Sequence, residues 1–596
     1  MSVETFSPTG ETLAAAIIGA GDRYPENGFI FQDVAGKEST YLWADVERAT
    51  AARAAALQAQ GLKKGDRVGL IVIEPEDFVL NFFGAIRVGI VPVPLYPPLS
   101  MGELDAYIER LAGILRTSGA SLLITSERLK NVLWGVVDKV PSLTRLMTLE
   151  QMKQSTGEPT HVEVTPDDVC FLQYTSGSTS DPKGVVVTHA NLVANVTAIM
   201  HHMQLDPTKD KILCWLPLYH DMGLIGFVIS ALVWGQTCVL VPTLRFLKRP
   251  NTWLASVSEY KATITFCPPF ALALAVRRAK PADLEKWDLS SLRCVGVGAE
   301  PINADAARQF TEVFHEHCGL PQHAVLPAYG MAEATLAISL KPPNDVFRTR
   351  FVDPQRFEAE GLAVDVPDGE TALEHVSCGV PFPLHEVTIV DPESGAELEE
   401  SREGEICVAG PSVCAGYFQN PEASAESFRD GRLHTGDLGY LADGQVYVTG
   451  RLKDLIILNG RNIHPQSLEW PLYGVEGVRK GNVVAFSVPG DSTEELVVAL
   501  ERRGDSDPVV LEAAVRAKLS DDFGVSPAHV IVIDANLLPK TSSGKLQRRK
   551  TRQLYLGQGL GSQGERTKGA NANKVTLAKH VARSVWTRVK YKARGN

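Results

Sequence analysis

The sequence predicts an α/β fold followed by a smaller α+β unit. Helix-like and strand-like segments alternate through the first two-thirds of the 596 residues. The strand-like segments are continuously apolar, which is typical of largely parallel sheets covered by helices. From about 374 to 448, short strands and turns replace this alternation, and we expect a distorted β-barrel there. Residues 451–556 predict a separate small α+β domain.

The alternation is clearest near the start of the chain. The alanine-rich stretch 42–60 predicts a helix, and 67–73 predicts a buried strand. A second helix is expected at 77–88 and a second strand at 90–94. Further core strands are predicted at 121–125, 263–266 and 292–297.

The later segments follow other patterns. Short strands are predicted at 386–390 and 404–410, within the expected barrel. In the small domain, the sequence predicts strands at 482–487, 496–500 and 530–533, and a helix at 509–519.

Composition and charge limit the classes of function. Hydrophobic residues make up 44% and charged residues 22%, as in a soluble globular protein, and the net charge of −11 argues against general nucleic-acid binding. Nine dispersed cysteines form no CxxC pair, so neither a zinc knuckle nor a disulfide framework is indicated. Scattered thiols and a poor match to a signal peptide favour a cytoplasmic location.

One segment resembles a membrane span in composition. Residues 223–242 contain no charge and are long enough in principle. Gly235, Gln236 and Thr237 interrupt the segment, and a β-rich stretch follows. We therefore expect a buried helix, a turn and a core strand.

The most informative stretch is 174–189. It places Thr175, Ser176, Gly177, Ser178 and Thr179 in one run, followed by Lys183. Glycine allows close backbone approach to an anion, hydroxyls donate hydrogen bonds, and lysine adds a point charge suited to phosphate. The order differs from a Walker A loop, because Lys183 precedes its glycine and β-branched residues follow. The run predicts a triphosphate cradle of another kind; the alternative is a polar surface loop.

This stretch resembles the phosphate-binding signature of the adenylate-forming superfamily, which includes acyl-CoA synthetases, peptide-synthetase adenylation domains and luciferases. Taken alone, each further match could be a common turn or a solvated lysine. Together they occur in the superfamily's order and extend over most of the chain. They are 328–335, 434–439, 450–456 and 539–547, with an adenosine-contacting turn at 297–301.

The resemblance implies a nucleotide site. Tyr329 is a planar ring that can pack on adenine, and Asp437 can accept hydrogen bonds from both ribose hydroxyls. Arg451 resembles the nucleotide-contacting arginine of the superfamily. The implied ATP-binding set is Thr175, Ser176, Gly177, Ser178, Thr179, Lys183, Gly298, Ala299, Glu300, Tyr329, Gly330, Met331, Asp437 and Arg451.

It also implies a catalytic set and a division into domains. Lys545 matches the mobile lysine that bridges the carboxylate and the α-phosphate, and Glu333 with Thr175 is expected to hold Mg2+. Lys453 and Asp454 fall at the interdomain hinge. The implied architecture is a large N-terminal domain, 1–450, of two doubly wound α/β subdomains plus the barrel, with a mobile C-terminal domain, 451–560.

Other segments resemble the fatty acyl-AMP ligase branch. They are 91–98, 215–226, 249–254 and 261–270. Within them, His220 aligns with the substrate-positioning residue; the alternative is a core histidine that bonds a backbone carbonyl.

The connection between Glu333 and residue 379 is also long, with an insertion at about 341–375, and long connections are usually functional or disordered. In this branch such an insertion is associated with poor use of coenzyme A and transfer to an acyl carrier protein of a polyketide or peptide synthase. A tolerated surface loop is the alternative.

The end of the chain is a basic tail, 561–596. Residues 567–596 carry eight Lys or Arg and no acidic residue, with apolar residues at helical spacing. Such a segment can lie on an anionic membrane or dock an acidic partner, and a disordered soluble tail is the alternative.

The sequence therefore favours a cytoplasmic enzyme that uses ATP and Mg2+ to activate a fatty acid and load a carrier protein. A medium- or long-chain acyl-CoA synthetase is the runner-up, and a catalytically silent scaffold is the third hypothesis.

Overall fold

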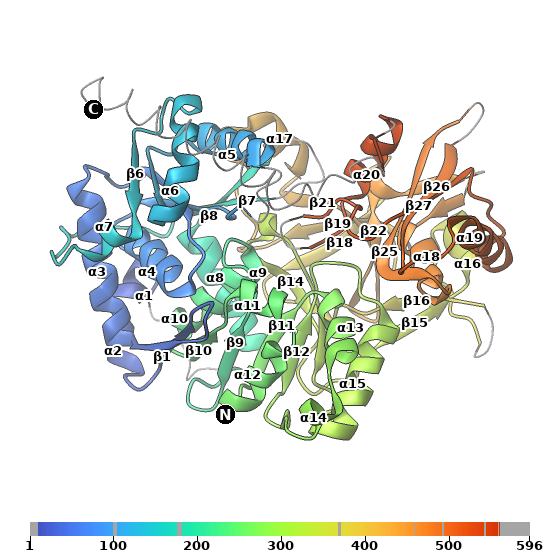
Figure 1. Cartoon of the computed structure of the whole chain (residues 1–596), viewed down its shortest axis with the longest axis horizontal. Helices are drawn as coiled ribbons and strands as arrows, with labels where there is room; N and C mark the ends of the chain where they lie inside the picture. Colours follow the sequence, from blue (N-terminus) through green and yellow to red (C-terminus); the bar gives the residue numbers. More distant parts are fainter. Residues whose placement is uncertain are drawn as a thin grey trace.

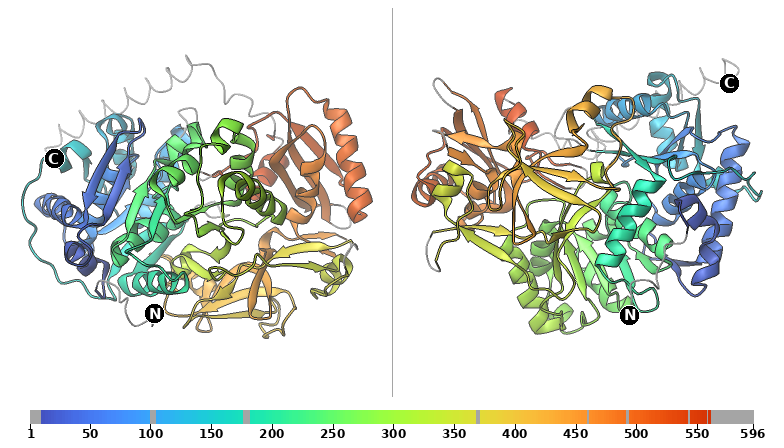
Figure 2. Two further views of the ribbon diagram at one scale, coloured as in Figure 1. Left: turned by 90° about the horizontal axis from the view of Figure 1, so that it is seen from below. Right: turned by 180° about the vertical axis from the view of Figure 1, so that it is seen from behind.

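The computed structural model describes residues 10–98, 104–175, 182–367, 371–458, 461–490, 494–541, 544–557 and 559–560. The basic tail expected at 561–596 lies outside these residues. The first described elements (blue) and the last described elements (orange to red) lie at opposite ends of the molecule in all views (Figures 1 and 2).

The larger α/β sheet has nine strands in the order β17-β14-β13-β12-β11-β9-β10-β1-β2. Within this order, the neighbours from β13 to β1 pair parallel. At the two edges, β2 on one side and β14 and β17 on the other pair antiparallel. Its strands are β1 (Gly28–Gln32), β2 (Glu38–Leu42), β9 (Lys211–Cys214), β10 (Thr237–Leu240), β11 (Ile264–Cys267), β12 (Cys294–Val297), β13 (Val325–Gly330), β14 (Ala337–Leu340) and β17 (Val380–Pro381).

The second α/β sheet is smaller, with four parallel strands in the order β4-β3-β5-β6. Strands β4 and β5 are buried at every position, as expected for parallel strands between helices. Its strands are β3 (Arg67–Ile71), β4 (Val91–Pro94), β5 (Leu122–Thr125) and β6 (Arg145–Thr148). The two sheets and their helices confirm the predicted α/β class.

The helices of this region begin and end as the local sequence indicates. Helix α8 is capped by Thr188, whose side chain accepts the backbone N–H of Asn191, and α15 by Asn303 in the same way. The principal helices are α1 (Leu13–Ile18), α3 (Trp43–Ala59), α4 (Pro75–Ile86), α5 (Leu104–Ser118), α6 (Glu127–Leu133), α7 (Leu149–Lys153), α8 (His189–His202), α12 (Thr252–Tyr260), α13 (Pro269–Arg278) and α15 (Ala304–Cys318).

The charge-free segment 223–242 forms a helix, a turn and a core strand, as predicted. A π-helical turn, η4 (Leu224–Ile229), joins α9 (Asp221–Gly223) to α10 (Ser230–Trp234), and Gly235 at φ 69° ends the helix before β10. None of the helices in the described part of the chain has the length and apolar character needed to span a bilayer.

The region expected to be a barrel is an antiparallel sheet. The strands β18 (Glu386–Val390), β19 (Gly404–Ala409), β20 (Phe428–Arg429), β21 (Arg432–Ala442) and β22 (Gln445–Arg451) pair around β21. Among the described residues, β18 pairs with β19 and bridges Glu397 through Val390, and β22 bonds the segment 377–379 on its other side. Full closure of these strands into a distorted barrel stays a prediction.

The insertion is an ordered unit in its described part. Strands β15 (Thr349–Val352) and β16 (Leu373–Val376) pair antiparallel, and α16 (Pro354–Glu360) follows β15. Asp353 caps α16 by accepting the backbone N–H groups of Gln355 and Arg356. Phe357 packs in a small core with Tyr440 and Tyr447 of the antiparallel sheet.

The smaller C-terminal domain has a three-stranded sheet, β25-β26-β27, with hydrophobic clusters on its two faces. The insertion lies beside it, as α16, β15 and α18 show in Figure 1. Its elements are β23 (Ile456–Leu458), β24 (Arg461–Ile463), α18 (Pro465–Glu469), β25 (Val478–Pro489), β26 (Glu494–Arg502), α19 (Pro508–Phe523), β27 (His529–Ile533) and α20 (Arg548–Leu556). Helix α20 was not expected. The boundary at 450/451 stays a prediction.

Candidate active site

One cavity of about 3350 Å³ lies between the α/β sheets, the antiparallel sheet and the C-terminal domain. Every predicted site residue that the structure describes lines it. These are Thr175, Lys183, His220, Gly298, Ala299, Glu300, Tyr329, Gly330, Met331, Glu333, Asp437, Arg451, Lys453, Asp454 and Lys545. Ser176, Gly177, Ser178 and Thr179 lie outside the described residues.

The predicted phosphate loop connects the strands of a hairpin. Strands β7 (Val169–Tyr174) and β8 (Gly184–Thr188) pair antiparallel, and the backbone N–H of Thr175 donates to the carbonyl of Lys183 at 3.1 Å. A side chain at Gly184 would meet the Tyr174 ring at 2.8 Å, so glycine is required where the two strands meet. The hairpin thus holds Thr175 and Lys183 together at the cavity wall.

Lys183 and Glu333 both contact Tyr417, one at its ring and the other at its hydroxyl. The Lys183 ammonium lies 4.7 Å from the centre of the Tyr417 ring, and the Tyr417 hydroxyl donates to Glu333 Oε1 at 2.8 Å. Burial raises the pKa of Glu333, and the bond from Tyr417 opposes that rise. Tyr417 was missed by the sequence analysis; it lies 84 positions from Glu333 and belongs to none of the matched segments.

Glu333 sits in a strained turn. It belongs to the short 3-10 helix η5 (Ala332–Ala334), and Thr335 follows at φ 67°, a conformation that β-branched residues rarely adopt. The Thr335 hydroxyl donates to the carbonyl of Ser412 at 2.6 Å, which anchors the turn to the loop before Tyr417. The turn therefore directs the Glu333 carboxylate toward Tyr417 and the cavity.

The part of the cavity wall predicted to contact adenosine is formed by tight backbone packing. A side chain at Gly298 would meet the carbonyl of Ala328 at 2.7 Å, and Ala299 adopts φ 69°. Tyr329 donates its hydroxyl hydrogen to Asp437 Oδ2 at 2.9 Å.

Arg451 Nε reaches Asp437 Oδ1 at 2.9 Å, and that carboxylate raises the pKa of Arg451. The antiparallel register places Asp437 of β21 directly opposite Arg451 of β22. Asp437 is thus held at both oxygens beside the cavity.

Lys545 reaches into the cavity from the C-terminal domain. Its ammonium donates to the carbonyl of Ala299 at 2.7 Å. Burial lowers the pKa of Lys545, and the negative charges of Glu300 and Asp221 oppose this. The lysine predicted to be catalytic and the turn predicted to contact adenosine, which are far apart in the sequence, are therefore in direct contact.

His220 faces a carboxylate rather than a backbone carbonyl. Its Nδ1 lies 2.5 Å from Asp221 Oδ1, and the ring lines the cavity with 28% of its side chain exposed. This arrangement differs from the core-histidine alternative. Asp221 had not been assigned a role.

The predicted hinge residues make contacts in two directions. Lys453 pairs with Glu426 of the N-terminal domain at 3.5 Å, while Asp454 accepts from Arg548 of α20 at 3.3 Å. Arg548 also pairs with Glu469 at 2.7 Å, so it fixes Asp454 to the body of the C-terminal domain. A rotation about these residues stays a prediction.

A separate part of the cavity wall is apolar. Side chains from α8, η4 and α13 contribute to it, along with β9. They include Ile199, Met200, Met203, Ile212, Phe227 and Leu274.

Comparisons with known proteins identify the family of the chain. The family model described as AMP-binding enzyme matches residues 20–418. The chain is 40% identical over 508 residues to a provisionally named acyl-CoA synthetase of Caulobacter vibrioides, covering 84% of this chain and 87% of the relative. It is 32% identical to a long-chain-fatty-acid–AMP ligase of Mycobacterium marinum, covering 91% and 96%. It is also 32% identical to a medium-chain-fatty-acid–[acyl-carrier-protein] ligase of Moorena producens, covering 85% and 88%.

Solved structures give the same picture. A structure from a study of fatty acyl-adenylate ligases from E. coli and L. pneumophila superposes with a TM-score of 0.86 at 34% identity, covering 92% of this chain and 98% of that one. An McyG A-PCP structure with phenylalanyl-adenylate superposes with a TM-score of 0.81 at 26% identity, covering 92% and 95%. The chain therefore belongs to the family of AMP-binding enzymes, the adenylate-forming superfamily.

Proposed function

We propose that this protein activates a fatty acid with ATP, forming a fatty acyl-adenylate and pyrophosphate, and then transfers the acyl group to the phosphopantetheine thiol of an acyl carrier protein. The observation that carries the first step is the contact of Lys545 with the carbonyl of Ala299. It brings a cation from the C-terminal domain into the cavity that also holds His220 and Asp437.

Adenylation requires positioning and charge neutralisation more than proton transfer. The substrate carboxylate attacks the α-phosphorus, the bond to the β-phosphate oxygen breaks, and pyrophosphate leaves with the electron pair. Lys545 would bridge the carboxylate and the α-phosphate, while Lys183 would neutralise the departing pyrophosphate. His220, oriented by Asp221, would place the carboxylate.

The residues around Glu333 suit Mg2+. A carboxylate is a hard oxygen donor, Tyr417 bonds only its Oε1, and Thr175 adds a hydroxyl to the same cavity wall. When bound, the ion would neutralise charge on the phosphates. Tyr417 would keep the carboxylate in place and Lys183 beside it.

The apolar wall supports a hydrocarbon substrate. Met200, Met203 and Phe227 line the cavity and are each at most 3% exposed. An acyl chain bound against them would gain roughly 0.8 kcal/mol of binding free energy for each CH2 removed from water. The relative from Mycobacterium marinum, named a long-chain-fatty-acid–AMP ligase, agrees with this substrate class.

Two features favour a carrier protein as the acceptor. First, the insertion bonds the C-terminal domain: Arg461 Nε donates to Glu358 Oε2 at 2.8 Å, and the Phe357 ring lies 6.0 Å from His464. Second, Arg277 of α13 interacts electrostatically with its neighbour Arg278 and with Arg479 and Arg503 of the C-terminal domain. All four line the cavity, which suits the phosphate of a pantetheine arm or an acidic carrier.

The alternative acceptor is coenzyme A, which the name of the Caulobacter vibrioides relative favours. Purified protein supplied with Mg-ATP and radiolabelled dodecanoate separates the two. We expect acyl transfer to holo-carrier protein and little acyl-CoA. Efficient formation of acyl-CoA would overturn the proposed acceptor, and absence of any acyl-adenylate would overturn the first step.

A further inference from the structure

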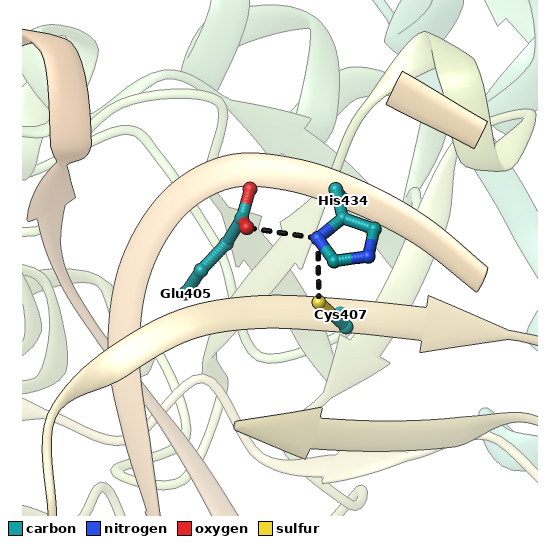
Figure 3. A group of neighbouring side chains, drawn as sticks. All are labelled: Glu405, Cys407 and His434. Carbon is teal, nitrogen blue, oxygen red and sulfur yellow. Dashed lines mark hydrogen bonds and ion pairs between the residues drawn. The ribbon is translucent and has the colours of Figure 1, made fainter. Parts of the chain in front are cut away.

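Three metal-ligating side chains converge on the sheet behind the ribose-binding loop. Glu405 and Cys407 lie on β19 and His434 on β21, where Cys407 and His434 are directly opposed in the antiparallel register (Figure 3). His434 Nδ1 is 2.9 Å from Glu405 Oε2 and 3.4 Å from Cys407 Sγ. One ligand atom from each residue lies within 4.8 Å of the other two. At most a tenth of the Glu405 and His434 side chains is exposed, and Cys407 is fully buried.

The geometry does not suit nucleophilic catalysis. A thiol relay needs the base to bond the thiol through one ring nitrogen and the orienting carboxylate through the other. Here both groups face the same nitrogen, Nδ1. Convergence of three donors on one point is instead what a metal ion requires.

The hydrogen-bonding environment of His434 Nδ1 is also contradictory without a metal ion. Arg429 Nη2, which can only donate, lies 3.0 Å from this nitrogen, while the Glu405 carboxylate, which can only accept, lies 2.9 Å away. A single ring nitrogen cannot accept from one and donate to the other. With a metal ion in place of the guanidinium, the Nδ1 lone pair would face the ion. The Glu405, Cys407 and His434 ligand atoms would then all bind the metal.

We propose that Glu405, Cys407 and His434 form a binding site for Zn2+ or a similar divalent transition metal. Sulfur, imidazole nitrogen and carboxylate oxygen are the ligands that Zn2+ takes in proteins, whereas a thiol is a poor ligand for Mg2+. The site is therefore distinct in chemistry from the expected Mg2+ position at Glu333. Water or a fourth side chain would complete the shell.

An entry path exists beside the cluster. A pocket of about 460 Å³ is lined by His434 and Arg429 together with the acidic Glu393 and Asp430. The Arg429 side chain is 45% exposed, so it can move into solvent when a cation arrives. Binding of the metal would release the Cys407 thiol proton to solvent.

The site is coupled to the loop that carries Asp437. The backbone N–H of Gly436 donates to Glu405 Oε1 at 2.9 Å, and Gly436 precedes Asp437 directly. A metal that draws the Glu405 carboxylate toward Cys407 would weaken this bond and displace the loop. We therefore expect bound Zn2+ to raise the KM for ATP; this coupling rests on the proposed function, whereas the binding itself does not.

Titration of the full chain with Co2+ as a spectroscopic probe tests the site. A thiolate-to-cobalt charge-transfer band that one equivalent of Zn2+ abolishes is expected. Cys407→Ser and His434→Gln should each weaken binding by at least about tenfold. Arg429→Ala should strengthen it, because it removes the competing cation. Cys414→Ser, which changes another buried cysteine, should leave the band unchanged.

Several outcomes would overturn the proposal. They are the absence of a thiolate band, an unchanged affinity in Cys407→Ser or His434→Gln, and weaker binding in Arg429→Ala. Circular dichroism identifies a variant that fails to fold. The metal affinities of the two remaining variants then decide whether the site exists. If the band appears but no ATP-dependent activity is found, the metal site stands and the proposed function fails.

Discussion

The Lys545 ammonium and the carbonyl oxygen of Ala299 are joined by a hydrogen bond of 2.7 Å that crosses from the C-terminal domain to the larger α/β sheet. The described structure is therefore closed over the cavity. In this arrangement Lys545 lies beside Glu300 and Asp221, whose carboxylates compensate its charge.

Lys545→Ala should reduce acyl-adenylate formation by about 10²–10³-fold, because the charge that stabilises the transition state is lost. Transfer of acyl groups from supplied acyl-adenylate should be largely unchanged. Pyrophosphate exchange measures the first step, and loading of holo-carrier protein measures the second. Lys518→Ala is the matched control, since Lys518 is an exposed lysine of α19 paired with Asp522. Equal losses in both steps would show that Lys545 acts on the fold instead.

Tyr417→Phe should shift the acidic limb of the pH–rate profile to higher pH. The Tyr417 hydroxyl lowers the pKa of Glu333, which burial raises, so its removal raises that pKa further. A protonated Glu333 cannot bind Mg2+, and the loss of activity with falling pH therefore begins earlier. The measurement is kcat/KM for Mg-ATP against pH. Phenylalanine keeps the ring beneath Lys183, whereas Tyr417→Leu removes that contact too; a limb that does not move in Tyr417→Phe contradicts the assignment.

Arg461→Ala should loosen the contact between the insertion and the C-terminal domain. It leaves the Glu358 carboxylate, which is 3% exposed, buried without its ion-pair partner, at a cost of roughly 3–5 kcal/mol. We expect faster proteolysis between the domains and increased formation of acyl-CoA. Arg356→Ala is the control, because Arg356 lies on the same helix as Glu358, α16, but pairs with the exposed Glu360. Faster proteolysis without acyl-CoA would mean that the insertion does not select the acceptor.

The buried pair of Glu403 and His464 should make docking of the domains sensitive to acid. His464 Nε2 and Glu403 Oε1 are 2.8 Å apart, and although burial raises the pKa of Glu403, the charge and hydrogen bond of His464 lower it overall. A carboxyl whose folded pKa is lowered stabilises the fold above its unfolded value of about 4.5 and loses that contribution as pH falls through the folded pKa.

Thermal unfolding followed against pH measures this contribution. The melting temperature should fall steeply below about pH 4.5 in the unchanged protein and less steeply in Glu403→Gln, which cannot titrate. Parallel curves for the two proteins would show that the pair does not carry the pH dependence.

The α/β class was predictable because buried parallel strands leave continuous apolar runs, as at β4 and β5. Whether the β-rich region closes into a barrel was not predictable from the sequence. Closure depends on pairing between strands such as β18 and its neighbours, and the pattern of apolar residues does not record which strands pair. The ordered insertion left a local signal that the sequence analysis did not use: Asp353 followed by Pro354 is a typical helix start. Helix α20 has apolar residues only in its last turn, where Tyr555 packs near Phe486, and its Arg548 pairs with Asp454 and Glu469 of distant segments.

Which residues meet in the cavity was predictable where they occur in short motifs. Gly298, Tyr329, Asp437 and Lys545 all line one cavity despite their separation in the sequence. Tyr417 and the cross-domain contact of Glu358 with Arg461 were not predictable, because each depends on tertiary packing between segments without a shared motif. The hydroxyl-rich run 176–179 stays a prediction.

The π-helical turn η4 affects how the apolar wall can change during evolution. Each α-helical residue advances the chain by about 100°, and a π turn accommodates one residue more than an α turn does. Deleting a single residue from η4 would restore regular winding and rotate Phe227 relative to the residues that follow. A one-codon deletion can therefore reshape the apolar wall of the cavity in a single step, without altering the strands that line the rest of the cavity.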